Sequence, residues 1–424
     1  MSRPYLFTSE SVSEGHPDKL ADQISDAVLD LFLAEDPSAK VACETLVTDE
    51  RVIVTGEFRV QPVSRFAEIR AGIEPLVRQV LRDAGYSASF PGINPETCNV
   101  QLYLNAQSDD IHRGVEQEDG EIGAGDQGLV FGYATDETPE RLPLTLSLAH
   151  RLVQRQAELR KAGTLPWLRP DAKSQVTVRY GATGPEAVTA VVLSTQHSPD
   201  IDAETLRRQV ISHIIEPVIP PELRDPGLVY HINPTGNFVV GGPKADVGLT
   251  GRKIIVDTYG GACPHGGGAF SGKDPTKVDR SAAYAARQIA KTVVNAQLAR
   301  RCTVQLAYAI GVAAPVSLLV DTHGTGVVEE DRLERAVREH FKLTPAGIIR
   351  ALSLRTPLYR PTATYGHFGR PDLNLPWERT PKVDALRLAV QQKPLSQIQL
   401  DRFYREANSG DISPEMQAWW RNRY

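Results

Sequence analysis

The densest group of residues capable of chemistry lies between Gly266 and Asp279, where three consecutive glycines precede two lysines and an aspartate. Consecutive glycines let a backbone approach a ligand closely and turn its N–H groups toward an anion. Lys273 and Lys277 add mobile positive charge, and Asp279 adds a carboxylate at the start of the next predicted helix. A polyphosphate bound together with a divalent metal ion fits this mixture of groups.

Two other interpretations of the same stretch are disfavoured. The spacing from Gly267 to Lys273 matches the front of a P-loop, but Asp274 stands where a Ser or Thr would bind magnesium. His265 followed by glycines looks like an esterase oxyanion loop, but the chain has no G-x-S-x-G motif to supply a nucleophile. A phosphotransferase that releases ADP is kept as an alternative function.

A second group lies at the mouth of a predicted helix, where His16 and Asp18 flank Pro17. Free N–H groups and the helix dipole favour anions at such a place. Asp18 could hold magnesium while His16 contacts a phosphate oxygen. Alternatively, Asp18 only caps the helix and His16 is a surface residue.

Two further glycine-rich loops carry charged side chains. The G-x-G-x-x-G segment 123–128 precedes a strand-like run rather than a helix, which excludes a dinucleotide-binding turn and leaves a tight loop that presents Asp126. Segment 241–246 is followed by Arg252 and Lys253, which could clamp phosphates beside a glycine-rich loop or simply be solvated.

The elements that must position these residues follow from apolar periodicity and β-rich runs. The helical pattern predicts helices at 18–35, 66–84, 144–161, 203–216, 279–298 and 329–341. Strands are predicted at 41–48, 51–60, 99–105, 175–180, 187–194, 253–258, 303–310 and 316–320. Three strand–helix units of similar size predict three α/β domains of repeated architecture.

The expected fold is α/β of the α+β type, with three similar domains of mixed β-sheet plus helices related by pseudo-threefold symmetry. We place the N-terminal domain at 1–108, the central domain at 121–240 and the C-terminal domain at 241–380. Residues 381–424 form a C-terminal extension with the character of a tail.

Composition excludes several classes of protein. The 424 residues carry 47 Lys and Arg against 52 Asp and Glu, a net charge of -5, so nothing favours nucleic acid as the main partner. No apolar run reaches the length of about 18 residues that a membrane span needs, and no signal peptide is recognised. Four scattered cysteines without a C-x-x-C pair fit free thiols in a cytoplasmic protein.

With these motifs in place, the chain resembles the S-adenosylmethionine synthetases, or methionine adenosyltransferases. The matching pieces are residues 7–19, 123–128, 165–177, 248–260 and 266–287, and the similarity extends to about Trp377. The resemblance implies that methionine sulfur attacks C5′ of ATP and displaces tripolyphosphate, which is hydrolysed to phosphate and pyrophosphate. A neutral thioether needs no general base, so catalysis should depend on cations around the leaving group and on orientation.

The resemblance also implies a role for each matching residue. The catalytic residues around the phosphates would be His16, Lys173, Arg252, Lys253 and Lys273. The nucleotide would also contact Asp126, Asp171, Asn237, Phe238, Asp246 and Ala269. Methionine would contact Glu57, Gln107, Asp246 and Lys277. Two Mg²⁺ ions per site would bind at Asp18 and Asp279, and one K⁺ per subunit at Glu44.

In the family the site lies between two subunits of a dimer, and two dimers commonly form a tetramer, so we expect a homo-oligomer. Asn237 stands where Arg is usual, and Asp109 and Arg113 depart from the usual residues of the active-site loop. A catalytically silent regulatory subunit is a further alternative. The retained charges of the site count against it.

Overall fold

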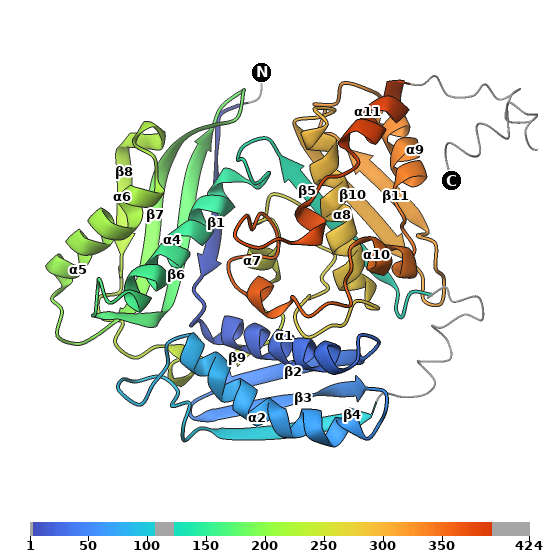
Figure 1. Ribbon diagram of the computed structural model, residues 1–424. Coiled ribbons are helices and arrows are strands. Elements are labelled where there is room, and N and C mark those ends of the chain that lie inside the picture. The colour runs from blue at the N-terminus through green and yellow to red at the C-terminus, as the bar shows by residue number, and fades with distance from the viewer. Residues whose placement is uncertain (1–2, 107–122, 392–424) are drawn as a thin grey trace, which may run out of the picture.

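The computed structural model describes residues 3–106 and 123–391. Within them, three β-sheets surround a layer of helices (Figure 1), and the faces that carry α1, α4 and α8 turn toward the middle of the molecule. Two sheets are mixed and the third is antiparallel. This arrangement confirms the expected α+β class with three units of sheet and helix.

The first sheet has four strands. In order across the sheet they are β4 (Asn99–Ala106), β3 (Arg51–Arg59), β2 (Lys40–Thr48) and β9 (Gly248–Leu249). β2 and β3 form an antiparallel hairpin whose turn places Glu50 at a φ of 50°. β4 joins β3 in parallel after a crossover through α2 (Arg65–Asp83). α1 (Pro17–Glu35) packs against β2 and α2, and most of its apolar side chains are buried in that contact.

The second sheet also has four strands, β1 (Tyr5–Val12), β6 (Leu168–Tyr180), β7 (Pro185–His197) and β8 (Arg224–Ile232). α4 (Leu144–Lys161) packs on β1 and β6. Between β7 and β8 the chain forms α5 (Ala203–Val210), a π-helical turn (Ile211–Ile215) and α6 (Glu216–Val218). The crossover between these strands makes β7 and β8 parallel.

The third sheet consists of β11 (Ser317–Asp321), β10 (Arg301–Tyr308) and β5 (Gly128–Thr135). α8 (Val278–Asn295) covers β5 and β10, and α9 (Glu330–His340) covers β11. The short helix α10 (Pro345–Ala351) packs on α8. The start of α8 carries Asp279, so this sheet holds one of the expected site residues in place.

Strands exchange between the three parts of the sequence. The N-terminal strand β1 pairs with β6 of the second sheet, β5 pairs with β10 of the third, and β9 pairs with β2 of the first. The sheets therefore combine strands that lie far apart in the chain, and each sheet is tied to its neighbour.

The strand predicted at 253–258 is wrong. The segment forms a short helix, α7 (Ile254–Asp257), in which the Asp257 N–H donates to Lys253 O at 2.9 Å. Ile254, Ile255 and Val256 favour a strand by their β-branched side chains, but tertiary contacts of the segment override that preference. Three strands, β1, β8 and the two-residue β9, were not predicted.

Part of the C-terminal extension is helical. α11 (Val383–Gln391) packs against α8 and α9, and Leu386 and Val390 are buried in that contact. The final residues, including the aromatic pair Trp419 and Trp420, lie outside the described residues.

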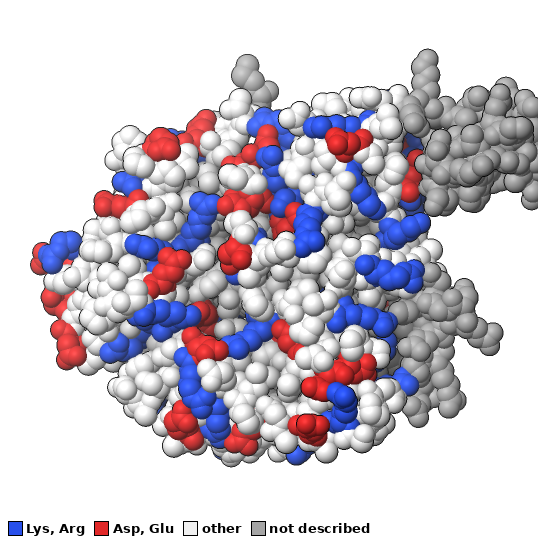
Figure 2. Space-filling model, in the orientation of Figure 1, with Lys and Arg blue, Asp and Glu red and all other residues white. Residues whose placement is uncertain are grey.

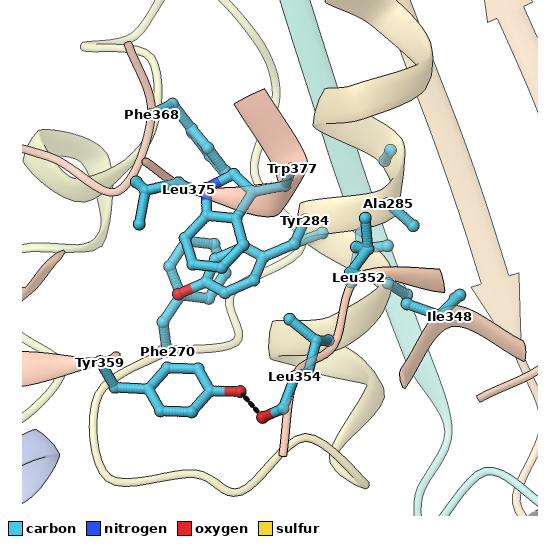
Figure 3. Packing of buried hydrophobic residues seen from close by; sticks show 14 of the residues in the cluster. Phe270, Tyr284, Ala285, Ile348, Leu352, Leu354, Tyr359, Phe368, Leu375 and Trp377 are labelled. Atoms are coloured by element: carbon cyan, nitrogen blue, oxygen red, sulfur yellow. Dashed lines mark hydrogen bonds between the residues drawn. The ribbon is translucent and has the colours of Figure 1, made fainter. Parts of the chain in front are cut away.

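The core of the first and third sheets is continuous, while the second sheet has a core of its own. Aromatic side chains fill the middle of the larger core (Figure 3). Tyr284 stacks on Trp377 with ring centroids 3.9 Å apart. The Arg280 guanidinium lies 4.2 Å from the ring centroid of Tyr359, whose hydroxyl donates to Leu354 O.

On the face drawn in Figure 2, basic and acidic side chains are interspersed. Among the described residues, no helix is both long and apolar enough to cross a membrane.

Candidate active site

Four aspartates occur at every fourth residue of α1, which places them on one face of the helix. Each carboxylate accepts hydrogen bonds from backbone N–H groups of a segment distant in sequence. The pairs are Asp18 with Leu249, Asp22 with Gly251, Asp26 with Gly272, and Asp30 with Leu358, Tyr359 and Arg360. α1 therefore positions both glycine-rich segments of the expected site, a function of this spacing that the sequence analysis missed.

His16 caps the N-terminus of α1. Its Nδ1 accepts the Asp18 N–H at 3.1 Å, and the side chain is almost fully buried. Burial, followed by the positive charges of Lys253 and Lys173, lowers the pKa of His16 to about 3. The imidazole is therefore neutral, and because Nδ1 accepts, Nε2 carries the proton and is a hydrogen-bond donor.

Asp18 is ionised beside this histidine. Its Oδ2 lies 2.5 Å from Lys253 Nζ, and its Oδ1 accepts the Leu249 N–H at 3.0 Å. Burial opposes the charged form, but the hydrogen bonds from Lys253 and Leu249 lower the pKa of Asp18 below its usual value. Lys253 immediately precedes α7, so α7 carries the cation toward the N-terminus of α1.

A buried carboxylate with a free oxygen lies in the same group. The Asp171 Oδ2 accepts the Gly242 N–H at 2.9 Å, whereas the buried Oδ1 has no hydrogen-bond partner. Burial raises the pKa of Asp171 to about 6. Lys173 follows two residues later on β6 and is exposed. An unpaired buried acceptor costs about 1–3 kcal/mol, which a donor on a bound ligand would recover.

A second group surrounds the start of α8. Lys273 Nζ lies 2.6 Å from Asp279 Oδ2. Burial raises the pKa of Glu44, and the charge of Lys273 partly offsets that shift, which places the Glu44 carboxylate near the lysine. A Cβ atom on Gly268 would lie 2.4 Å from Asp279 Cγ, so a side chain at this position would have to displace the Asp279 carboxylate.

The loop of the second group is anchored to β2. Lys273 forms a β-bridge with Ala42, and Asp274 Oδ2 accepts the Val41 N–H at 2.7 Å. Lys277 pairs with Asp274. Asp274 therefore stabilises the loop. This role was not predicted, because Asp274 was considered only as a mismatch to the P-loop pattern. Glu57 lies directly opposite Ala42 on β3, on the same edge of the group.

Three of the nucleotide-binding candidates, Asn237, Phe238 and Asp246, lie in the segment after β8. The His197 N–H donates to Phe238 O at 3.0 Å, and the Phe238 N–H donates to His197 Nε2 at 3.0 Å. Asn237 and Asp246 are exposed, and the negative charge of Asp246 contributes to the raised pKa of Asp171. Asp171 and this segment therefore adjoin.

The remaining candidates are less closely placed. Asp126 and Arg252 are exposed, and Asp126 accepts the N–H of its neighbour Gln127. Ala269 lies in the loop of the second group and is partly exposed. Gln107 and the loop departures Asp109 and Arg113 lie outside the described residues.

The expected metal ligands belong to different groups. Asp18 pairs with Lys253, whereas Asp279 pairs with Lys273. Within the described residues, no three His, Cys, Asp or Glu side chains gather into a potential metal site. Single carboxylates suit Mg²⁺, which keeps several waters and is usually held by one or two carboxylates together with substrate phosphates.

These features together define a class of protein. The three-unit α+β fold carries two groups of cations and carboxylates, with a neutral histidine donor at a helix N-terminus, and such an arrangement suits a protein that binds a polyphosphate nucleotide. Comparison with known sequences identifies the family within this class: the chain belongs to the S-adenosylmethionine synthetases. The family's N-terminal domain model matches residues 4–109, its central domain model 121–238 and its C-terminal domain model 240–379.

Individual relatives agree. The chain is 56% identical over 395 residues to the S-adenosylmethionine synthase of Desulforudis audaxviator, 54% over 386 residues to that of Nitratiruptor sp., and 53% over 387 residues to that of Wolinella succinogenes. Each match covers 91% of this chain and 98% of the relative. The family expected from the motifs is confirmed.

Proposed function

We propose that the chain synthesises S-adenosyl-L-methionine from ATP and L-methionine, as a methionine adenosyltransferase. The observation that carries the proposal is the neutral N–H donor of His16, buried at the N-terminus of α1 and close enough to Lys253 and Lys173 for both to lower its pKa. A neutral donor between cations suits an oxygen that gains negative charge as a bond breaks.

In this reaction the sulfur lone pair attacks C5′ of ATP, and the C5′–O bond breaks with its electrons on the tripolyphosphate. His16 Nε2–H would donate to the phosphate next to the breaking bond. Lys173, Lys253 and Lys273 would balance the charge of the leaving group, with Arg252 beside them. No proton is removed from the thioether, so no base is required. Water then hydrolyses the tripolyphosphate to phosphate and pyrophosphate.

Substrate orientation falls to other side chains. The free Asp171 Oδ1 would accept a hydrogen bond from the nucleotide, and Phe238 would stack on adenine. Asp126, Asn237, Asp246 and Ala269 would complete the nucleotide contacts. Glu57, Gln107, Asp246 and Lys277 would hold methionine, whose ammonium and carboxylate require groups of opposite charge.

Metal ions fit the carboxylates that the structure offers. Asp18 and Asp279 would each supply oxygen to Mg²⁺, which neutralises phosphate charge when bound. Glu44, whose charged form burial disfavours, would gain from a monovalent cation such as K⁺ beside it. The lysines now paired with Asp18 and Asp279 would then be released toward the phosphates.

We further propose that the site is shared between subunits of a homodimer, which assembles as a dimer of dimers. Two separate groups of charges in one chain would then be two half-sites. A mixing experiment tests this: His16→Asn and Lys273→Met dimers, each inactive, are dissociated and reassembled together. If the half-sites come from different subunits, one site per mixed dimer is intact and about a quarter of the wild-type activity returns. No recovery would contradict the shared site.

Domain boundaries and location remain part of the proposal. Domains at 1–108, 121–240 and 241–380 are proposed as segments of chain, with β1, β5 and β9 exchanged between their sheets. All four cysteines are free and buried, which fits the reducing cytoplasm as the place of action.

The activity is tested by mass spectrometry of products formed from ATP and L-methionine with Mg²⁺ and K⁺. S-adenosylmethionine, phosphate and pyrophosphate in equal amounts would support the proposal. ADP with a phosphorylated acceptor would support the phosphotransferase instead, and no methionine-dependent product would indicate a silent subunit.

A further inference from the structure

We propose that Lys19 and Asp257 form a buried positioning pair that holds the segment carrying Arg252 and Lys253 against the first turn of α1. The inference deepens the proposed function and depends on it, because these two cations are assigned to the leaving group there. Neither Lys19 nor Asp257 touches the candidate ligand site.

The contacts of Lys19 are all internal. Its Nζ lies 2.5 Å from Asp257 Oδ1 and 2.8 Å from Asp22 Oδ2, and all three side chains are at most 3% exposed. Burial alone would lower the pKa of Lys19, but the two carboxylates raise it above its usual value, so the ammonium stays charged. Lys19 thus links α1 directly to the end of α7.

The same group also fixes the start of the segment. Asp22 Oδ1 accepts the Gly251 N–H at 2.9 Å, and Gly251 adopts a φ of 79°, which favours glycine. The stretch from Gly251 to Asp257 is therefore held at both ends, at Gly251 by Asp22 and at Asp257 by Lys19. Arg252 and Lys253 lie within that stretch, one turn of α7 from the second anchor.

Two parallel bridges result between α1 and the 251–257 segment. The inner bridge is Lys19–Asp257, and the outer bridge is Asp18–Lys253, which faces the candidate site. Asp18 and Lys19 are neighbours, and Lys253 O accepts the Asp257 N–H. A shift in the inner bridge must therefore move the outer one, and a displacement of about 1 Å at reacting groups can cost about 100-fold in rate.

The surroundings of the pair strengthen the link. The His367 N–H donates to Asp257 O at 3.1 Å, and His367 Nδ1 is hydrogen-bonded to the hydroxyl of Tyr284 on α8. α7 is thereby tied to α8, whose first turn carries Asp279 of the second group. The inner bridge thus joins α1 to α7, and His367 connects the same end of α7 to α8.

The test compares three variants with the wild-type chain. Lys19→Met/Asp257→Asn removes both charges of the bridge. In Asp257→Asn alone, Lys19 keeps the amide oxygen and the Asp22 carboxylate as partners. This variant replaces the double variant if the double variant does not fold. Lys291→Met is the matched control, because Lys291 is a largely buried ammonium that pairs with Glu378 at 2.6 Å, away from the site.

We expect the double variant to lose at least about 10-fold in kcat and in affinity for Mg²⁺–tripolyphosphate by titration calorimetry, with KM for methionine nearly unchanged. Asp257→Asn should show a smaller loss in the same two quantities. Lys291→Met should lower the thermal midpoint without changing either. Kinetic constants of the bridge variants equal to those of Lys291→Met would overturn the proposal. A wild-type chain that forms no S-adenosylmethionine would instead refute the proposed function.

Discussion

Charge neutralisation at single residues is the main requirement of the proposed chemistry. Lys273 is the cation of the second group, held 2.6 Å from Asp279 and close to Glu44. The two carboxylates hold the ammonium in place, and a bound polyphosphate would compete with them for it. Loss of this charge should therefore affect the leaving group more than the binding of methionine.

We expect Lys273→Met to reduce turnover by at least about 100-fold, on the scale of a lost transition-state donor. Steady-state kinetics of S-adenosylmethionine formation measure this directly, with Lys291→Met as the control for loss of an ammonium elsewhere. Near-normal turnover would remove Lys273 from the account of the leaving group.

Asp171 should oppose stability and support binding. Burial raises the pKa of Asp171 in the folded chain to about 6. Folding therefore disfavours the ionised form, and the free energy of unfolding falls as pH rises from the usual pKa of an aspartate toward about 6. Asp171→Asn should therefore be more stable than wild type at pH 7.5 by urea denaturation, yet bind ATP more weakly.

The pH dependence of ATP affinity checks the same assignment. The affinity of the wild-type chain for ATP should fall as pH drops below about 6, because Asp171 becomes protonated. Asp171→Asn should not show this decrease. His16, with a pKa of about 3, stays neutral throughout. The same decrease in ATP affinity in Asp171→Asn would contradict the role of the free carboxylate oxygen.

The sequence indicated candidate site residues, but it did not indicate which side chains pair with one another. The motifs indicated His16, Asp18, Lys273 and Asp279 as site residues. The burial of Lys19 between Asp22 and Asp257 depends on contacts across more than 200 positions of chain, for which one sequence gives no signal. The spacing of the aspartates along α1 is a signal in the sequence that could have indicated such contacts.

At the scale of elements, helices with clear apolar periodicity were predicted to within a few residues. α7 was not, because four residues are too few for a period and their β-branched side chains favour a strand. β1 was missed because polar side chains interrupt its apolar run. α11 was missed because the end of the chain reads as a tail.

α11 should stabilise the C-terminus of α8. The last turn of α8 has no basic residue of its own, and Arg387 Nε donates to Ala296 O at 2.8 Å. We expect Arg387→Ala to lower the free energy of unfolding by about 0.5–1 kcal/mol, the scale of a cation at a helix C-terminus. Urea denaturation measures this, and activity should be unchanged. A stability equal to wild type would show that the contact contributes nothing.

At the scale of the whole molecule, exchange of strands makes the three sheets interdependent. β1, which precedes His16, pairs in the second sheet, and β9, which precedes Lys253, pairs in the first sheet. The family and the three-unit architecture could be predicted from sequence, because they depend on local motifs and periodicity. The exchange of strands could not, because it depends on long-range pairing.

Two truncations separate α11 from the residues that follow it. Deletion of 392–424 should leave both stability and S-adenosylmethionine formation unchanged. Deletion of 382–424 also removes Leu386 and Val390 from the core, and it should lower the thermal midpoint while the chemistry persists. A folded but inactive shorter chain would show that the extension completes the site or the oligomer.

The central claim is that sulfur attacks C5′ and that the whole tripolyphosphate leaves with the 5′ oxygen. ATP labelled with ¹⁸O at the 5′ oxygen tests this in a single assay with L-methionine, Mg²⁺ and K⁺. We expect mass spectrometry to find the label in phosphate or pyrophosphate, and none in S-adenosylmethionine. Label retained in an adenosine-containing product such as ADP would contradict it.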